Sequence, residues 1–339
     1  MSKRKLTRKQ MWRVQKIQEE KARRVHRKAQ AIEDAELGPE LSGCVVSHFG
    51  KLVEVEELNA QGEATGTCMQ CHFRANLGAI VTGDRVVWRQ GKSGQGMIEA
   101  VLPRSSLLSR PDVRGQLKPV ASNIDFIVLV VTPWPTPSSL LIDRYLVAAE
   151  LQGIDVKILL NKTDLLTEEN QKPIEDMLKV YQSIGYQVLT SSATENKGLV
   201  ALQQHLDHKV SAFVGQSGVG KSSLVNALLP GVNAKVGELS ESSKLGRHTT
   251  TNARLFHFPT GGDLIDSPGI REFGLWHLEK SDIINGYREF QEFIGYCKFR
   301  DCRHQQEPGC ALKAAVDEGK VTSRRFANYF ALLNSDLVN

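Results

Sequence analysis

Residues 210–228 read VSAFVGQSGVGKSSLVNAL, and this stretch decides the fold class. A short apolar strand, Val210–Val214, leads into G-x-x-x-x-G-K-S, and apolar residues at helical spacing follow, which is the sequence context of a phosphate-binding P-loop. The glycines allow backbone N–H groups to converge on phosphate oxygens, while Lys221 is placed to reach the β- and γ-phosphates and Ser222 to bind Mg²⁺. The nucleotide-binding residues predicted here are Gly215, Gln216, Ser217, Gly218, Val219, Gly220, Lys221, Ser222 and Ser223, with Lys221 also assigned to catalysis.

The region before the P-loop predicts a doubly wound α/β sheet. Phe126 to Val131 is a continuous apolar run, as expected of a parallel strand covered on both faces. Alternating strand and helix patterns follow it, which is typical of this fold class. The expected segments are helix 140–151, strand 156–160, helix 174–184, strand 187–190, helix 199–206 and strand 210–214.

The identity of the base is predicted by Asn161-Lys162-Thr163-Asp164, at the end of strand 156–160. The Asp164 carboxylate can accept hydrogen bonds from guanine N1–H and N2–H₂, a donor pair that adenine lacks. Carboxyl ends of parallel strands are also where such sheets bind ligands. Ser191-Ser192-Ala193 ends the next strand, so Ser192 and Ala193 are weaker candidates to support the base edge.

Two further motifs predict the γ-phosphate sensors. Asp266-Ser267-Pro268-Gly269 follows a short strand, so that Asp266 can hold Mg²⁺ through water and the Gly269 N–H can face the γ-phosphate. Gly246-Arg247-His248 precedes three threonines, of which Thr250 is assigned to Mg²⁺ and to catalysis. Loss of the γ-phosphate would release this switch segment.

These motifs resemble the guanine-nucleotide-binding set of the translation-factor class of GTPases, but their order is circularly permuted. The tetrad and the Ser-Ala motif come before the P-loop rather than after it. The chain therefore leaves the predicted GTPase domain directly after its second switch, and whatever follows Gly269 is tied to that switch.

Charge is concentrated at the N-terminus of the 339-residue chain. Residues 1–30 hold twelve Lys or Arg against Glu19 and Glu20, a net charge of +10 in a chain whose total is +5. We expect such a run to be mobile until it meets a polyanion, so RNA or DNA is the expected partner, with a solubilising tail as the alternative. The sequence has no apolar stretch long enough to cross a bilayer and no secretory signal, which predicts a cytoplasmic protein without a membrane partner.

Between the tail and the predicted GTPase domain, residues 41–102 read as about five short strands. Val53 and Val55 alternate with Glu54 and Glu56, as in a half-buried strand. Five strands in some sixty residues suit an OB-like barrel, although any small β-domain fits the spacing. The polar stretch Arg104 to Ala121 reads as a linker.

After residue 275 the chain is expected to be helical and irregular around one metal site. Cys297, Cys302, His304 and Cys310 form a closed Cys₃His set, the ligand set of a structural zinc ion. A second cluster, Cys68-x-x-Cys71-His72, matches a haem-attachment motif but lies in the β-domain of a chain without an export signal. It is interpreted as two strand thiols or at most a weak metal site.

With its basic tail, barrel, permuted GTPase motifs and Cys₃His module, the chain resembles one family over nearly its whole length, the bacterial ribosome small-subunit-dependent GTPase A. The resemblance implies a monomeric GTPase that binds the 30S subunit and 16S rRNA late in maturation, with other assembly factors as further partners. Its hydrolysis of GTP to GDP would be stimulated by the subunit and drive its own release. The expected parts are a tail at 1–36, an OB-like barrel at 37–103, a permuted GTPase domain at 104–274 and a zinc-binding helical domain at 275–339.

Two other function classes stay open from the residues alone: an RNA-binding protein with a vestigial nucleotide site, and a GTPase whose partner is a protein or a membrane. The water-activating group is also open. Ile270 stands where Ras-like GTPases place a glutamine, and it can neither donate nor accept a hydrogen bond. His248, beside the switch threonines, is the candidate to replace it, and rRNA is the alternative source.

Overall fold

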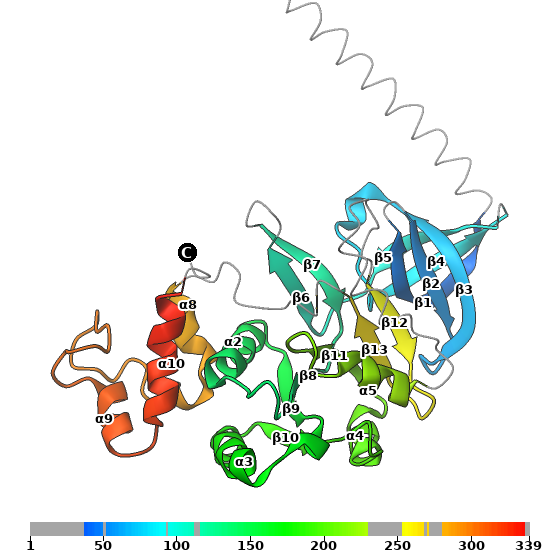
Figure 1. Ribbon diagram of the computed structural model, residues 1–339. Helices are drawn as coiled ribbons and strands as arrows, with labels where there is room; N and C mark the ends of the chain where they lie inside the picture. Colours follow the sequence, from blue (N-terminus) through cyan, green and yellow to red (C-terminus); the bar gives the residue numbers. More distant parts are fainter. Residues whose placement is uncertain are drawn as a thin grey trace, which may run out of the picture.

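The computed structural model describes residues 37–49, 52–92, 94–111, 116–229, 253–267, 270 and 280–335. The basic tail at 1–36 and the switch residues His248 and Thr250 lie outside these ranges, as does Gly269. The described chain forms a barrel, a mixed sheet flanked by helices, and a helical C-terminal part (Figure 1).

The N-terminal part is a closed five-stranded barrel. It consists of β1 (Leu37–Phe49), β2 (Leu52–Leu58), β3 (Ala64–Phe73), β4 (Arg85–Gly91) and β5 (Gly96–Val101). The strand order is β1-β2-β3-β5-β4, and β4 pairs back with β1, which closes the barrel. Val53 and Val55 are fully buried in its core beside Trp88, as their alternation with glutamates predicts. The OB-like assignment of this barrel stays a prediction.

The stretch predicted as a linker is instead a β-hairpin, so that prediction is wrong. It is built of β6 (Leu107–Pro111) and β7 (Leu117–Ser122), which form a separate two-stranded sheet. Leu108 pairs with Ala121, and both side chains are buried. An isolated two-stranded ribbon buries few of its residues, which explains why its sequence is mostly polar.

The central part is the doubly wound sheet predicted from the motifs. Its strands are β8 (Phe126–Val131), β9 (Asp155–Leu160), β10 (Gln187–Thr190), β11 (Val210–Val214), β12 (Arg254–His257) and β13 (Asp263–Asp266). They lie in the order β10-β9-β8-β11-β13-β12, and all pair in parallel except β12. The order reverses between β8 and β11, which places a topological switch point beside the P-loop.

Different helices cover the two faces of this sheet. The helices are α2 (Ser139–Glu150), α3 (Glu168–Ser183), α4 (Leu199–Leu206) and α5 (Lys221–Leu228). The odd-numbered residues of β8, from Ile127 to Val131, share a buried cluster with α2 and α3. The even-numbered residues, from Phe126 to Val130, share another with α4 and α5. Burial on both faces accounts for the uninterrupted apolar run of β8.

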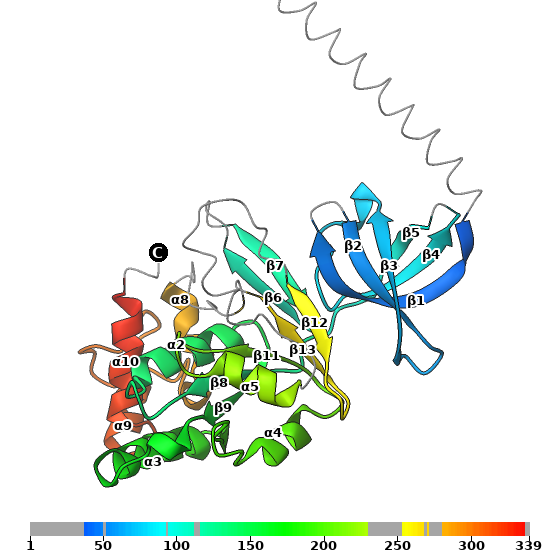
Figure 2. The same cartoon turned by 45° about the vertical axis from the view of Figure 1, so that its right-hand side comes forward.

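The barrel and the central sheet are continuous through β1 and β12. Among the described residues, Ser47 with Arg254 is the strand pair that joins them. Thr82 Oγ1 and Ser47 Oγ both donate to the Ala253 carbonyl, at 3.0 and 3.4 Å. Figure 2 shows the β12–β13 hairpin between the barrel and the remaining strands.

The C-terminal part packs on α2 through a buried charge network. It contains α8 (Lys280–Ile283), α9 (Ala311–Asp317) and α10 (Ser323–Leu333). Arg325 is 2 % exposed and donates to Asp143 of α2 at 2.6 Å and to both carboxylate oxygens of Glu289 at 2.7 and 3.0 Å. Tyr181 and Asn328 also donate to Asp143, each at 2.7 Å.

Within the described ranges, no helix is both long enough and apolar enough to cross a membrane.

Candidate nucleotide and metal sites

The P-loop connects β11 to α5 through two tightly packed glycines. Gly215 has φ 135° and Gly220 has φ 91°, in the region that side chains disfavour. A Cβ atom at Gly215 would lie 2.4 Å from the Val130 carbonyl, and one at Gly220 would lie 2.5 Å from Asn161 Nδ2. Lys221 Nζ donates to the carbonyls of Gly215 and Gln216 at 2.7 and 2.6 Å. The loop therefore sits close against the ends of β8 and β9.

Asn161, at the end of β9, joins two of the predicted motifs to each other. Its side chain is 1 % exposed, and its Nδ2 donates to the Val219 carbonyl of the P-loop at 3.0 Å. Its Oδ1 accepts from Ser191 Oγ at 3.0 Å. Asn161 thus connects the Asn-Lys-x-Asp tetrad, the Ser-Ser-Ala motif and the P-loop.

Lys162 crosses the P-loop from the same tetrad. Its backbone adopts φ 56°, and its Nζ donates to the Gly218 carbonyl at 2.7 Å. A non-glycine residue in this conformation carries local strain, which is common at ligand sites.

Asp164 lies in the turn after Lys162 with an exposed side chain, and Ser192 Oγ donates to its Oδ1 at 2.5 Å. The Ser192 hydroxyl also accepts from the Glu195 N–H. Ala193 is partly buried and packs against the cluster that contains α4 and α5. Ser192 therefore orients the carboxylate that is predicted to read the base.

The structure brings some predicted site residues together and leaves others undescribed. The P-loop, the tetrad and the Ser-Ser-Ala motif converge at the carboxyl ends of β9, β10 and β11. Ser222 is the second residue of α5, and Asp266 ends β13, the strand beside β11. Sequence reasoning missed that Ser191 holds Asn161, although its place directly after a predicted strand is the available signal.

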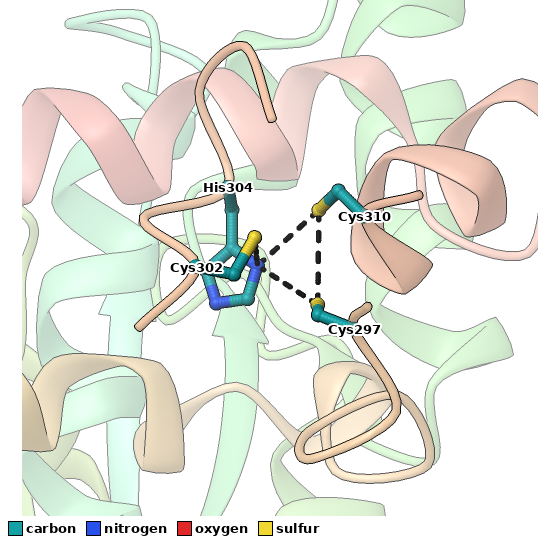
Figure 3. Close-up of side chains that lie close together, drawn as sticks. All are labelled: Cys297, Cys302, His304 and Cys310. Carbon is teal, nitrogen blue, oxygen red and sulfur yellow. Dashed lines mark hydrogen bonds between the residues drawn. The ribbon is translucent and has the colours of Figure 1, made fainter. Parts of the chain in front are cut away.

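The four predicted metal ligands meet at one point in the C-terminal part (Figure 3). His304 Nδ1 lies 3.5, 3.7 and 3.3 Å from the sulfurs of Cys297, Cys302 and Cys310. The Cys297 and Cys310 sulfurs are 3.9 Å apart. A tetrahedral zinc ion, with Zn–S of about 2.3 Å and Zn–N of about 2.0–2.1 Å, requires S–S and S–N separations of about 3.8 and 3.5 Å. The cluster therefore has the dimensions of a closed tetrahedral metal site.

Burial sets the protonation states of two of these ligands. Desolvation raises the pKa of Cys302 to about 11, so its thiol holds its proton near neutral pH until a metal displaces it. Desolvation also lowers the pKa of His304, which favours the neutral imidazole that ligates metals. Glu307 shapes the loop between the last two ligands by accepting the N–H groups of Arg303, Gln305 and Gln306 at 2.9–3.0 Å.

Cys68 and Cys71 do not form a second site of this kind. Both lie on β3, where Cys68 is exposed and Cys71 is buried in the barrel core. Residues three apart on a strand point to opposite faces, so the two sulfurs cannot hold one ion. Burial raises the pKa of Cys71 to about 12, as for an unreactive core thiol.

A P-loop after β11 and an Asn-Lys-x-Asp tetrad after β9 of one parallel sheet, with the tetrad earlier in the chain, define a circularly permuted P-loop GTPase. The chain belongs to the RsgA GTPase family, whose sequence profile matches residues 101–276. It is accordingly a GTP-hydrolysing enzyme, and such hydrolysis uses Mg²⁺ with GTP.

Relatives and solved structures agree with this assignment. The small ribosomal subunit biogenesis GTPase RsgA of Ectopseudomonas mendocina is 56 % identical over 339 residues, covering 99 % of this chain and 98 % of the relative. The crystal structure of YjeQ from Thermotoga maritima matches with a TM-score of 0.72 at 33 % identity, covering 87 % of this chain and 98 % of YjeQ. YloQ, described as a circularly permuted GTPase, matches with a TM-score of 0.68 at 28 % identity, over 87 % of this chain and 94 % of its own.

Proposed function

We propose that this GTPase acts late in the maturation of the small ribosomal subunit. It binds the 30S subunit and its 16S rRNA in the cytoplasm, hydrolyses GTP faster on the subunit, and leaves when the γ-phosphate is gone. The relatives' name, a small ribosomal subunit biogenesis GTPase, supports the partner. The basic N-terminal segment supports an RNA contact.

The observation that carries the coupling is the continuous sheet between barrel and nucleotide site. The Mg²⁺-side residue Asp266 pairs with Arg254, and Arg254 pairs with Ser47 of the barrel. Thr250 precedes Arg254, the first residue of β12, by four residues in the sequence. Covalent and hydrogen bonds therefore connect the γ-phosphate side of the site with the barrel over a short path, and the surface of the barrel can bind a partner.

The proposed nucleotide roles are supported by the places of the motifs at the strand ends. Lys221 supplies positive charge to the β- and γ-phosphates in the transition state, where charge compensation contributes most to rate. Asp164, oriented by Ser192, accepts the guanine N1–H and N2–H₂ donors. Ser222, Thr250 and, through water, Asp266 would hold Mg²⁺, which would neutralise phosphate charge when bound.

His248 is proposed to orient the attacking water, because Ile270 has no hydrogen-bonding group and is 1 % exposed in the core. The Cys₃His cluster is proposed to hold one structural zinc ion, since its four ligands leave no open coordination position. The protein is proposed to work as a monomer.

Co-sedimentation with purified ribosomal subunits tests the proposal. The full chain is incubated with 30S or 50S subunits in GDP or in a non-hydrolysable GTP analogue, and pelleted protein is quantified. We expect retention on 30S with the analogue and release with GDP. Equal pelleting in both nucleotides would indicate an RNA-binding protein without coupling, and no pelleting with 30S would exclude the partner.

A further inference from the structure

The junction between the barrel and the central sheet contains a histidine held by two carboxylates. His257, the last residue of β12, lies with Nε2 2.6 Å from Glu56 Oε2 on β2 of the barrel. Its Nδ1 lies 2.6 Å from Asp263 Oδ1, at the start of β13. We refer to Glu56, His257 and Asp263 as the junction clamp.

Burial and charge make the clamp strong. Glu56 is 3 % exposed and also accepts the Gly66 N–H at 3.2 Å. Hydrogen bonding to Asp263, and then to Glu56, raises the pKa of His257 to about 9 against the opposing effect of burial. At neutral pH the imidazole is therefore a cation that joins two carboxylates which would otherwise repel each other.

Other charged groups surround the clamp without replacing the histidine. Arg85 of β4 lowers the pKa of the buried Cys44 thiol, whereas Glu56 and Asp263 raise it. Likewise, Arg254 of β12 lowers the pKa of Cys68, whereas Glu54 and Glu56 raise it. Within the described residues, His257 is the cation within 4 Å of both Glu56 and Asp263.

The clamp lies at one end of a short hairpin whose other end holds Asp266. In that hairpin Arg254 pairs with Asp266, and His257 pairs with Asp263. The barrel contacts the Asp266 end through Ser47 and Thr82, both bonded to Ala253, and the clamp end through Glu56. The barrel therefore holds the β12–β13 hairpin at both of its ends.

We infer that His257 is a positioning residue for the Asp266 strand. When a partner binds the barrel and moves it, His257 carries that movement to the Asp266 strand, so that subunit-stimulated hydrolysis depends on the clamp. This inference rests on the proposed function, because it requires stimulation by the small subunit. Without the clamp the barrel still contacts the Asp266 end of the hairpin, but the hairpin can turn about that single contact, so that movement of the barrel no longer carries the Asp266 strand with it.

The dependence on pH has a defined sign. A histidine whose pKa is raised by the contact between barrel and hairpin stabilises that contact, and the stabilisation is complete below the ordinary histidine pKa of about 6.5. That contribution persists at neutral pH and is lost as the pH rises through about 9.

The test compares basal and 30S-stimulated GTP turnover in the full chain. The variants are His257→Gln, Glu56→Gln and the double variant. His208→Asn is the matched control, because His208 abuts the turn of the same hairpin at Gly261 and tolerates asparagine at its φ of 56°. We expect each clamp variant to lose about tenfold of the stimulation with unchanged basal turnover, within the range of known coupling effects. The double variant should be no worse than either single one.

Two further readouts separate coupling from simple loss of folding. In wild type the stimulation should decline as the pH passes about 9, whereas the residual stimulation of His257→Gln should not follow that titration. The pKa of the His257 ring, measured by NMR titration, should be lower in Glu56→Gln than in wild type. If 30S subunits stimulate wild type and stimulate both single variants to the same extent as wild type, the clamp inference is wrong. Equal loss of basal and stimulated turnover would also overturn it, whereas an unstimulated wild type would contradict the proposed function instead.

Discussion

Replacing Arg325 by methionine should weaken the packing of the C-terminal part on α2. Arg325 is 2 % exposed and makes charge-assisted hydrogen bonds to two carboxylates, Asp143 and Glu289. Methionine fills most of the volume, so the main loss is electrostatic. Removing one partner of a buried ion pair costs about 3–5 kcal/mol. Because Asp143 keeps donors from Tyr181 and Asn328, we expect the lower end, about 3 kcal/mol.

Amide hydrogen exchange along α10 measures this loss locally, which suits a chain of several parts. A loss of about 3 kcal/mol corresponds to exchange roughly 100-fold faster at the most protected α10 amides. The matched control is Arg324→Met, at an exposed neighbour on the same helix, which should change exchange by less than about threefold.

The defect should also depend on pH. Burial already raises the pKa of Asp143 with Arg325 present, and removal of the arginine raises it further. A carboxyl group with a raised folded-state pKa destabilises the fold once it ionises, so the defect should shrink as pH falls from 8 to 5. An Arg325→Met variant that exchanges like Arg324→Met at pH 8 would refute the reasoning.

Three further substitutions test the sites. Lys221→Ala should cost at least about 3 kcal/mol of transition-state stabilisation, a loss of about 100-fold in turnover, and turnover within about threefold of wild type would remove Lys221 from the active site. Asp164→Asn should weaken GTP binding and shift preference toward xanthine nucleotides, whose 2-carbonyl matches an amide donor, while unchanged GTP affinity in a binding titration would show that another group reads the base. Cys302→Ser should release metal and unfold the segment around Cys297, as measured by metal analysis and exchange; freshly purified wild type without zinc would contradict the site.

Local patterns predicted most of the central fold. The strands 187–190 and 210–214 and the helix 199–206 were predicted with the boundaries that the structure has. Each is a short segment, and each of the two strands is followed directly by a motif, so its form depends mainly on neighbours in sequence. The Cys₃His cluster was also predictable, because its four ligands lie within fourteen residues.

Contacts between distant segments could not be predicted in this way. Arg325 and Asp143 are 182 residues apart, and His257 and Glu56 are 201 residues apart. Each is an ordinary charged residue in its local sequence, and only the packing of whole elements brings the pairs together. The β6–β7 hairpin was missed for a related reason, since polar residues dominate a ribbon with little burial.

The most direct test of the account is GTP turnover measured alone, with 30S subunits and with 50S subunits. The account predicts that 30S subunits accelerate hydrolysis by more than about tenfold, that 50S subunits do not, and that Lys221→Ala abolishes the acceleration. Turnover that is the same with and without 30S subunits would contradict the central claim that this permuted GTPase is driven by the small ribosomal subunit.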